Sequence, residues 1–196
     1  MEINIILAGV GGQGILTIAA VIDFAALHSG LAIRQAEVHG MSQRGGAVQS
    51  HLRISDHEIY SDLIAEGTAN LLLSVEPLEA LRYLPFLAPQ GKIVTATDSF
   101  INMEGYPPME QILDELHHTN QPVLVNAADL AREAGSIKTS NMVMLGAASP
   151  FIGIATDMLE NSIEKLFKAK GTDITAMNIR AFRSGKALSQ LQATAT

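Results

Sequence analysis

No cysteine and no tryptophan occur in this sequence, and aromatic residues make up only 5% of its 196 positions. Without cysteine the chain can form no disulfide, thiolate metal site, iron–sulfur cluster or thiol nucleophile. With so few aromatic side chains, the core must consist mainly of Ile, Leu, Val, Ala and Met, within a hydrophobic fraction of 47%. Any redox chemistry near this chain must therefore use groups held elsewhere.

Basic residues are also scarce. Lysine and arginine number 13 against 20 acidic residues, which gives a formal net charge of −7, and neither sign forms a long run. This balance argues against binding to nucleic acid and against attraction to an anionic membrane surface. Small molecules and other proteins remain as binding partners.

Long hydrophobic runs are absent as well. The longest apolar segment, Ile15 to Leu27, is interrupted by Asp23 and is too short to span a bilayer. The first residues, MEINIILAG, include no basic leader, so we expect a cytoplasmic location. No low-complexity linker or internal repeat divides the chain, and we expect a single domain over residues 1–196.

Apolar patterning predicts strands and helices in alternating order. Runs over residues 3–9, 32–38, 46–55, 69–75 and 91–97 are typical of strands. A helix is expected after Gly14 and another over PLEALRYL, with Pro77 in its first turn and Pro85 as its stop, and the C-terminal third is helical. The pattern predicts an α/β fold: a three-layer α/β/α sandwich with an open, Rossmann-like, mainly parallel or mixed sheet.

A glycine-rich turn follows the first predicted strand. Gly9, Gly11 and Gly14 match the G-x-G-x-x-G fingerprint, and Gly12 and Gln13 complete the turn. In a dinucleotide site such glycines allow a tight turn and close approach to a pyrophosphate, which then lies at a helix N-terminus. The alternative is that glycine here only lets the helix pack closely on the strand, and the fingerprint alone leaves both possibilities open.

The residues that follow differ from those of a dinucleotide-binding fold. Glu37 is a candidate for the ribose hydroxyls, but the polar segment HGMSQRGG then leads directly to another strand instead of a crossover helix. In this segment His39 supplies an imidazole, Gln43 an amide and Arg44 a fork of donors, a set that suits a carboxylate, a phosphate or a partner carbonyl. A glycine-rich hairpin with an exposed arginine is the alternative.

Four blocks in order cover essentially the whole chain: GVGGQGILT, AEVHGMSQRGGAVQSHLRIS, VEPLEALRYLPFLAPQGKIV and GSIKTSNMVMLGAAS. Together they resemble the gamma-type subunit or domain of the 2-oxoacid:ferredoxin oxidoreductases. The HGMSQRGG form is similar to the beta subunit of the indolepyruvate enzymes, whereas pyruvate and 2-oxoglutarate enzymes usually have proline and glutamate before Arg-Gly-Gly. Asn70 stands where relatives often have aspartate.

The resemblance implies one half of an enzyme. The whole would oxidatively decarboxylate an arylpyruvate with coenzyme A, giving an arylacetyl-CoA, carbon dioxide and reduced ferredoxin. Thiamine diphosphate, magnesium and iron–sulfur clusters would be held by a large alpha subunit. This chain would dock on that subunit and complete its active-site cleft, and would be inactive alone.

Site residues follow from the same resemblance. The candidate catalytic residues are Arg44, His39 and Gln43. The coenzyme A diphosphate would suit the helix start at the glycine turn, where the candidate cofactor-binding residues are Gly9, Gly11, Gly12, Gln13 and Gly14.

Other polar residues have ordinary interpretations. His117 and His118 are adjacent and diverge on a helix, so we expect no metal site. Asn141 is expected to cap the helix that begins at NMVMLGA. Three further hypotheses stay open: a subunit of a pyruvate or 2-oxoglutarate enzyme, a separate NAD-dependent oxidoreductase, and a purely structural assembly subunit.

Overall fold

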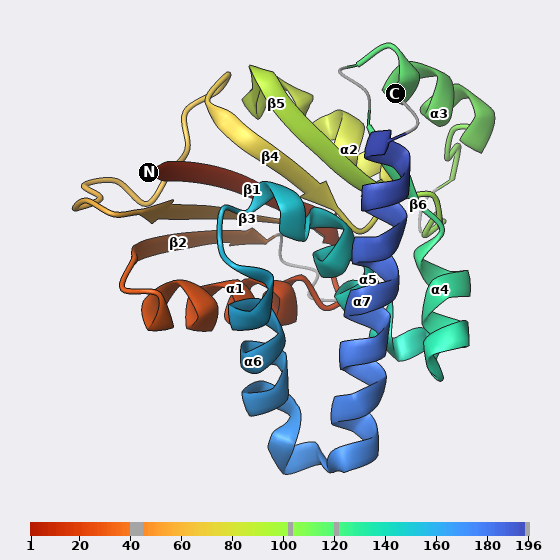
Figure 1. Ribbon diagram of the computed structural model, residues 1–196. Helices are drawn as coiled ribbons and strands as arrows, with labels where there is room; N and C mark the ends of the chain where they lie inside the picture. Colours follow the sequence, from red (N-terminus) through yellow and green to blue (C-terminus); the bar gives the residue numbers. More distant parts are fainter. Residues whose placement is uncertain (40–44, 102–103, 120–121, 195–196) are drawn as a thin grey trace.

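A computed structural model of the chain has three layers, with one sheet between two groups of helices (Figure 1). The structure describes residues 1–39, 45–101, 104–119 and 122–194, and of His39 only the main chain. The strands are β1 (Glu2–Val10), β2 (Ala32–His39), β3 (Ala47–Ser55), β4 (Ala69–Ser74), β5 (Leu87–Ala96) and β6 (Val123–Val125). The fold class predicted from the sequence is confirmed.

The helices follow the strands as expected for an alternating α/β chain. They are α1 (Ile15–His28), α2 (Pro77–Arg82), α3 (Met109–His117), α4 (Ala127–Ala134), α5 (Ser140–Ala148), α6 (Thr156–Phe167) and α7 (Thr172–Thr194). Short 3₁₀ turns lie at Leu84–Phe86, Ile137–Thr139, Ser149–Phe151 and Lys168–Lys170. Glu76 and Asn126 start α2 and α4, because each side chain accepts a hydrogen bond from the main-chain N–H three residues later.

The sheet is mixed, with strand order β2-β3-β1-β4-β5-β6. β1, β4, β5 and β6 are parallel, whereas β3 runs antiparallel to both of its neighbours, β1 and β2. The chain leaves β1 toward one side of the sheet, through α1 to β2, and later continues from β4 toward the other side. The carboxyl ends of β1 and β4 therefore lie where the direction of winding reverses, which is where open α/β sheets bind ligands.

Each face of the sheet has its own apolar core. One core packs the sheet against α1, α5, α6 and α7, with Ile22, Leu145 and Phe182 among its fully buried side chains. The other packs the opposite face against α2 and α3 through Ala80, Ile112 and other apolar residues. This division explains why β1 is almost entirely apolar: a strand covered on both faces needs no polar side.

α5 and α7 cross with their backbones in contact. A Cβ on Gly146 would lie 1.9 Å from the carbonyl oxygen of Phe182, and a Cβ on Gly185 would lie 1.9 Å from that of Val143. Neither clash can be relieved by turning a flexible side chain, since both involve main-chain atoms. The two glycines therefore fix how closely the helical C-terminal third packs around α5.

Candidate functional site

The glycine turn after β1 is joined to the start of β3. Gly11 N–H donates to the Gly46 carbonyl (2.9 Å) and Gly45 N–H donates to the Gly11 carbonyl (3.2 Å). Gly12 and Gly14 have φ angles of +105° and +82°, which glycine adopts without strain. The predicted turn and the end of the HGMSQRGG segment therefore lie side by side, although the sequence separates them by about thirty residues.

Two of the five predicted cofactor-binding residues have clear packing roles. A Cβ on Gly9 would lie 2.3 Å from Cγ2 of Val75, so glycine there permits close contact with the chain that follows β4. Gln13 uses its amide internally: Oε1 accepts from Val10 N–H (2.7 Å) and Nε2 donates to the Val75 carbonyl (3.3 Å). Gln13 thus fixes the turn against β4.

Asn141 does not cap α5, so that prediction is wrong. The N-terminal cap position is Thr139, without a side-chain cap bond, and Asn141 lies in the first turn of the helix. Its side chain is buried and Nδ2 donates to the Gly14 carbonyl at 3.3 Å. The reason is tertiary: the start of α5 packs against the start of α1, which the local sequence around Asn141 does not indicate.

A cavity of about 660 Å³ opens beside the glycine turn. Gly11, Gly12 and Gly14 form one wall with the first turn of α1, and Thr17 adds a hydroxyl. The first N–H groups of any helix lack intrahelical partners, and α1 has no acidic residue in its first turn to offset their partial positive charge. This wall suits an anion, while the rest of the cavity is mainly apolar, through Val10 and Val48 among others.

Glu37 also lines this cavity, but from a different place than in a dinucleotide fold. The predicted absence of a crossover helix is confirmed, since β2 pairs antiparallel with β3. β3 therefore lies between β2 and β1. The strand that carries Glu37 is about 10 Å from β1, whereas in a dinucleotide fold the two strands are neighbours about 5 Å apart.

The predicted catalytic residues lie at the end of β2 and in the connection that leads from β2 to β3. Gln43 and Arg44 lie outside the described residues, and so does the side chain of His39. The ends of the segment are described: β2 ends at His39, and Gly45 and Gly46 bond to Gly11. Both ends of the segment thus meet the same edge of the sheet as the glycine turn.

Glu76 is a buried carboxylate at this edge that sequence reasoning missed. It follows β4 and is 1% exposed. Oε2 accepts from Glu79 N–H (2.9 Å), while Oε1 accepts from Phe100 N–H (3.3 Å) and from the Tyr106 hydroxyl. Burial, together with the bond to this carboxylate, raises the pKa of Tyr106. A Glu-Pro pair at a helix start indicates the cap but not the two distant donors.

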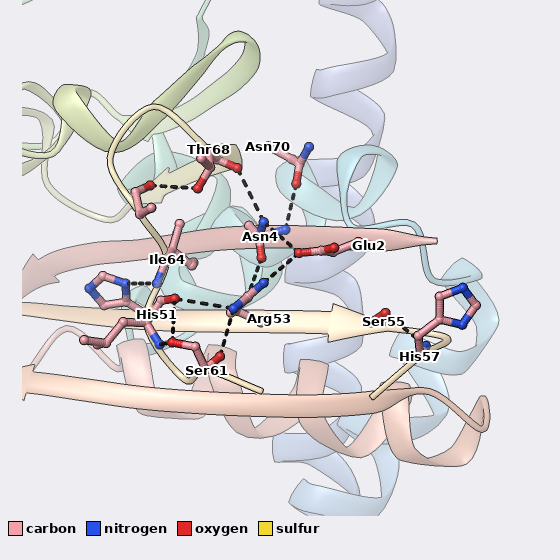
Figure 2. Close-up of polar contacts among 12 residues, drawn as sticks. Glu2, Asn4, His51, Arg53, Ser55, His57, Ser61, Ile64, Thr68 and Asn70 are labelled. Atoms are coloured by element: carbon pink, nitrogen blue, oxygen red, sulfur yellow. Dashed lines mark hydrogen bonds and ion pairs between the residues drawn. The ribbon is translucent and has the colours of Figure 1, made fainter. Parts of the chain in front are cut away.

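A second polar cluster lies at the opposite end of β1 and has a structural role (Figure 2). Arg53 on β3 donates to Asn4 Oδ1 (2.9 Å), Glu2 Oε1 (2.7 Å) and the Ser61 carbonyl (2.9 Å). Asn4 N–H in turn donates to Asn70 Oδ1 at 2.8 Å, a bond that aspartate at position 70 could also accept. The Arg53 guanidinium lowers the pKa of Glu2, and the whole cluster fixes the chain between β3 and β4 to the sheet.

His51 on β3 also holds the chain between β3 and β4. It is 3% exposed, its Nδ1 accepts from Ile64 N–H at 3.0 Å, and burial lowers its pKa.

Within the part of the chain that the structure describes, no three His, Asp or Glu side chains gather as metal ligands. No helix among those described residues is long and apolar enough to cross a membrane.

Comparison with known proteins identifies relatives along the whole chain. Residues 4–188 match the family model "Pyruvate ferredoxin/flavodoxin oxidoreductase". The indolepyruvate oxidoreductase subunit IorB of Archaeoglobus fulgidus is 36% identical, over 94% of each chain. The 2-oxoglutarate synthase subunit KorC of Methanothermobacter marburgensis is 29% identical, over 96% of this chain and 97% of its own.

The fold is also found in solved structures. A 2-oxoglutarate:ferredoxin oxidoreductase from Magnetococcus marinus, solved with 2-oxoglutarate, coenzyme A and succinyl-CoA bound, matches with a TM-score of 0.76 and 23% identity. The match covers 97% of this chain but only 31% of that one. The fold described above therefore occurs there as one part of a longer polypeptide.

Proposed function

Because the chain belongs to the pyruvate ferredoxin/flavodoxin oxidoreductase family, we propose that it is the small subunit of an indolepyruvate-type 2-oxoacid:ferredoxin oxidoreductase. The observation that carries the proposal is its 36% identity, over 94% of both chains, to an indolepyruvate oxidoreductase subunit. The 2-oxoglutarate synthase subunit is less similar, at 29% identity. The complete enzyme would convert an arylpyruvate and coenzyme A into arylacetyl-CoA and carbon dioxide, with the two electrons passing to ferredoxin.

The residues of this chain do not fit iron–sulfur clusters or magnesium-bound thiamine diphosphate. Iron–sulfur clusters are bound mainly by cysteine thiolates, and the sequence contains no cysteine. Magnesium-bound thiamine diphosphate needs oxygen ligands that converge, and the described residues contain no such group of acidic side chains. We therefore assign these cofactors, and the contact with ferredoxin, to a large partner subunit, and we place the complex in the cytoplasm.

We propose that coenzyme A binds in the cavity at the glycine turn. A diphosphate would lie at the first turn of α1, where Gly12 and Gly14 keep the backbone accessible. The apolar wall formed by Val10 and Val48 would contact the uncharged part of the molecule. Gly9 and Gln13 would support the site from behind, since both pack against Val75.

Arg44, His39 and Gln43 remain the proposed catalytic residues. The support for this proposal is that their segment starts at the end of β2 and ends at Gly45 and Gly46, which bond to Gly11 of the glycine turn. Arg44 would hold a carboxylate of the substrate or partner, or a phosphate of coenzyme A, through two parallel hydrogen bonds. His39 and Gln43 would contribute further hydrogen bonds, whereas thiamine itself supplies the carbanion chemistry.

Reconstitution tests this function. Ferredoxin reduction is measured with indolepyruvate, pyruvate and 2-oxoglutarate for the large subunit alone, this chain alone and the two together. We expect activity only for the pair, and the highest kcat/KM with indolepyruvate. Full activity of the large subunit alone would contradict a shared site, and a preference for 2-oxoglutarate or pyruvate would move the chain to that branch of the family.

Arg44→Ala separates a catalytic contribution from a purely structural one. Loss of one partner of a desolvated ion pair costs about 2–5 kcal/mol, so we expect kcat/KM to fall about 30-fold or more while the complex still assembles. Arg34→Ala is the matched control, because Arg34 is an exposed arginine on β2 and its ion pair with Asp62 is long, at 3.8 Å. Equal activity of both variants would favour a structural assembly subunit.

A further inference from the structure

Of the loop between β5 and α3 the structure describes residues 97–101 and 104–108, and hydrogen bonds hold both of these parts. At its start, Thr97 N–H donates to the Val125 carbonyl (2.9 Å), and Asp98 Oδ2 accepts from Ala128 N–H (2.9 Å). Farther along, Phe100 N–H and the Tyr106 hydroxyl both donate to buried Glu76. A buried carboxylate without such partners would be strongly unfavourable, so these bonds hold Phe100 and Tyr106 beside the start of α2.

The first described part of the loop exposes large apolar side chains. Phe100 is 43% exposed and Ile101 is 72% exposed, while the ring of Tyr106 packs inward on the core between the sheet and α3. Phe100 is connected to the candidate site through the end of β4: it donates to Glu76, and the preceding residue, Val75, accepts a hydrogen bond from Gln13 of the glycine turn. The segment that exposes Phe100 and Ile101 is therefore linked to the candidate site by these hydrogen bonds.

The charged residues between β5 and α4 are nearly all acidic in sequence. Between Lys92 and Arg132 the sequence contains no lysine or arginine, but it contains six acidic residues. Four of them follow Phe100 on the loop and on α3, with exposed side chains: Glu104, Glu110, Asp114 and Glu115. α3 forms the end of the molecule far from α6 (Figure 1), so this end is acidic. A protein that covers Phe100 and Ile101 must therefore bring basic side chains to the rim of an apolar pocket.

We propose that Phe100 and Ile101, held by Glu76, form a docking point for the large partner subunit, which receives them in an apolar pocket with a basic rim. The inference rests on the proposed function and adds the surface that binds. The connection of Phe100 to the glycine turn through Glu76 and Val75 favours this partner, and a second copy is disfavoured because it would oppose acidic α3 to acidic α3. The longer Magnetococcus polypeptide shows that this fold occurs in one chain with further parts of such an enzyme.

The test measures binding of the purified large subunit from the same organism to immobilised full-length chain. Ile101→Asp should weaken binding about tenfold or more, since loss of a buried apolar anchor at an interface has effects of this size. Leu27→Asp is the matched control: Leu27 is 60% exposed and lies at the far end of α1, beside the start of β2, at the opposite edge of the sheet. We expect its affinity to stay within twofold of the wild type, and both variants to melt like the wild type.

A second measurement addresses the acidic rim. Glu104→Lys should slow association severalfold at low salt, and the difference should shrink at high salt as charges are screened. The docking point is wrong if Ile101→Asp and Phe100→Ala bind like the wild type while the wild-type pair assembles and reduces ferredoxin. Failure of the wild-type pair to assemble would overturn the proposed function as well. If Ile101→Asp instead abolished a homodimer of this chain while binding to the large subunit was kept, the loop would be assigned to contact with a second copy.

Discussion

Asn141 Nδ2 donates to the Gly14 carbonyl across 127 residues of sequence, which joins the start of α5 to the start of α1. The same asparagine limits what can stand at position 14: a Cβ on Gly14 would lie 2.6 Å from Asn141 Nδ2, at a φ of +82°. Position 14 is therefore constrained by a side chain from α5 and by its own backbone. A larger residue at position 14 would therefore meet Asn141 of α5 first, and not the strand on which α1 packs.

Gly14→Ala should lower the free energy of unfolding by about 1–2 kcal/mol from backbone strain alone, and by more because of the contact with Asn141. In an Asn141→Ala background the same substitution should cost less, since the contact is gone. Urea denaturation of the four proteins of this double-mutant cycle gives the coupling between the two positions. Strictly additive effects would show that Asn141 moves aside freely.

The second prediction concerns Gly146 and Gly185, where α5 and α7 cross. Gly146→Ala and Gly185→Ala should each destabilise the protein by several kcal/mol, because either Cβ would meet a main-chain carbonyl at the crossing of α5 and α7. Gly30→Ala is a control for glycine itself, since a Cβ there meets nothing within 4 Å and only its positive φ opposes the change. Thermal unfolding that is equal for all three variants would mean that α5 and α7 can separate at little cost.

Local patterning predicted most of the elements but not their long-range contacts. The apolar run before Gly9 and the helical spacing after Gly14 were enough to place β1 and α1, because both patterns depend on neighbours in sequence. The antiparallel insertion of β3 between β1 and β2 and the contact of Asn141 with Gly14 depend on pairings that no local pattern encodes. Glu76 was missed for the same reason, since two of its donors follow it by 24 and 30 residues.

The isolated chain should bind NAD and NADP poorly or not at all, despite its G-x-G-x-x-G sequence. Gly11 N–H is already bonded to the Gly46 carbonyl, and β3 separates Glu37 from the turn. Titration calorimetry with each nucleotide checks the prediction. Micromolar binding, equivalent to about 8 kcal/mol, that disappears in Glu37→Ala would contradict it and revive the hypothesis of a separate NAD-dependent enzyme.

Asp23 makes stability depend on pH in a defined direction. It lies in α1, its Oδ1 is buried and has no hydrogen-bond partner among the described residues, and burial raises its pKa from 3.8 to about 6. The folded chain therefore holds this proton more tightly than the unfolded chain, so the contribution of Asp23 to stability falls as pH rises from about 4 to about 6. Above that window the folded protein contains a charged, partly buried carboxylate.

Asp23→Asn should consequently stabilise the protein at pH 7.5 and change it little at pH 3.5, where the wild-type carboxyl is protonated in both states. One pKa unit corresponds to about 1.4 kcal/mol, and because solvent reaches part of this side chain we expect a gain of about 1–2 kcal/mol at pH 7.5. Asp114→Asn, at an exposed position on α3, is the control and should show no such pH-dependent gain. The measurement is urea denaturation of the three proteins at both pH values. An Asp23→Asn variant that is no more stable than the wild type at pH 7.5 would mean that Asp23 keeps an ordinary pKa and that water or a neighbour solvates Oδ1.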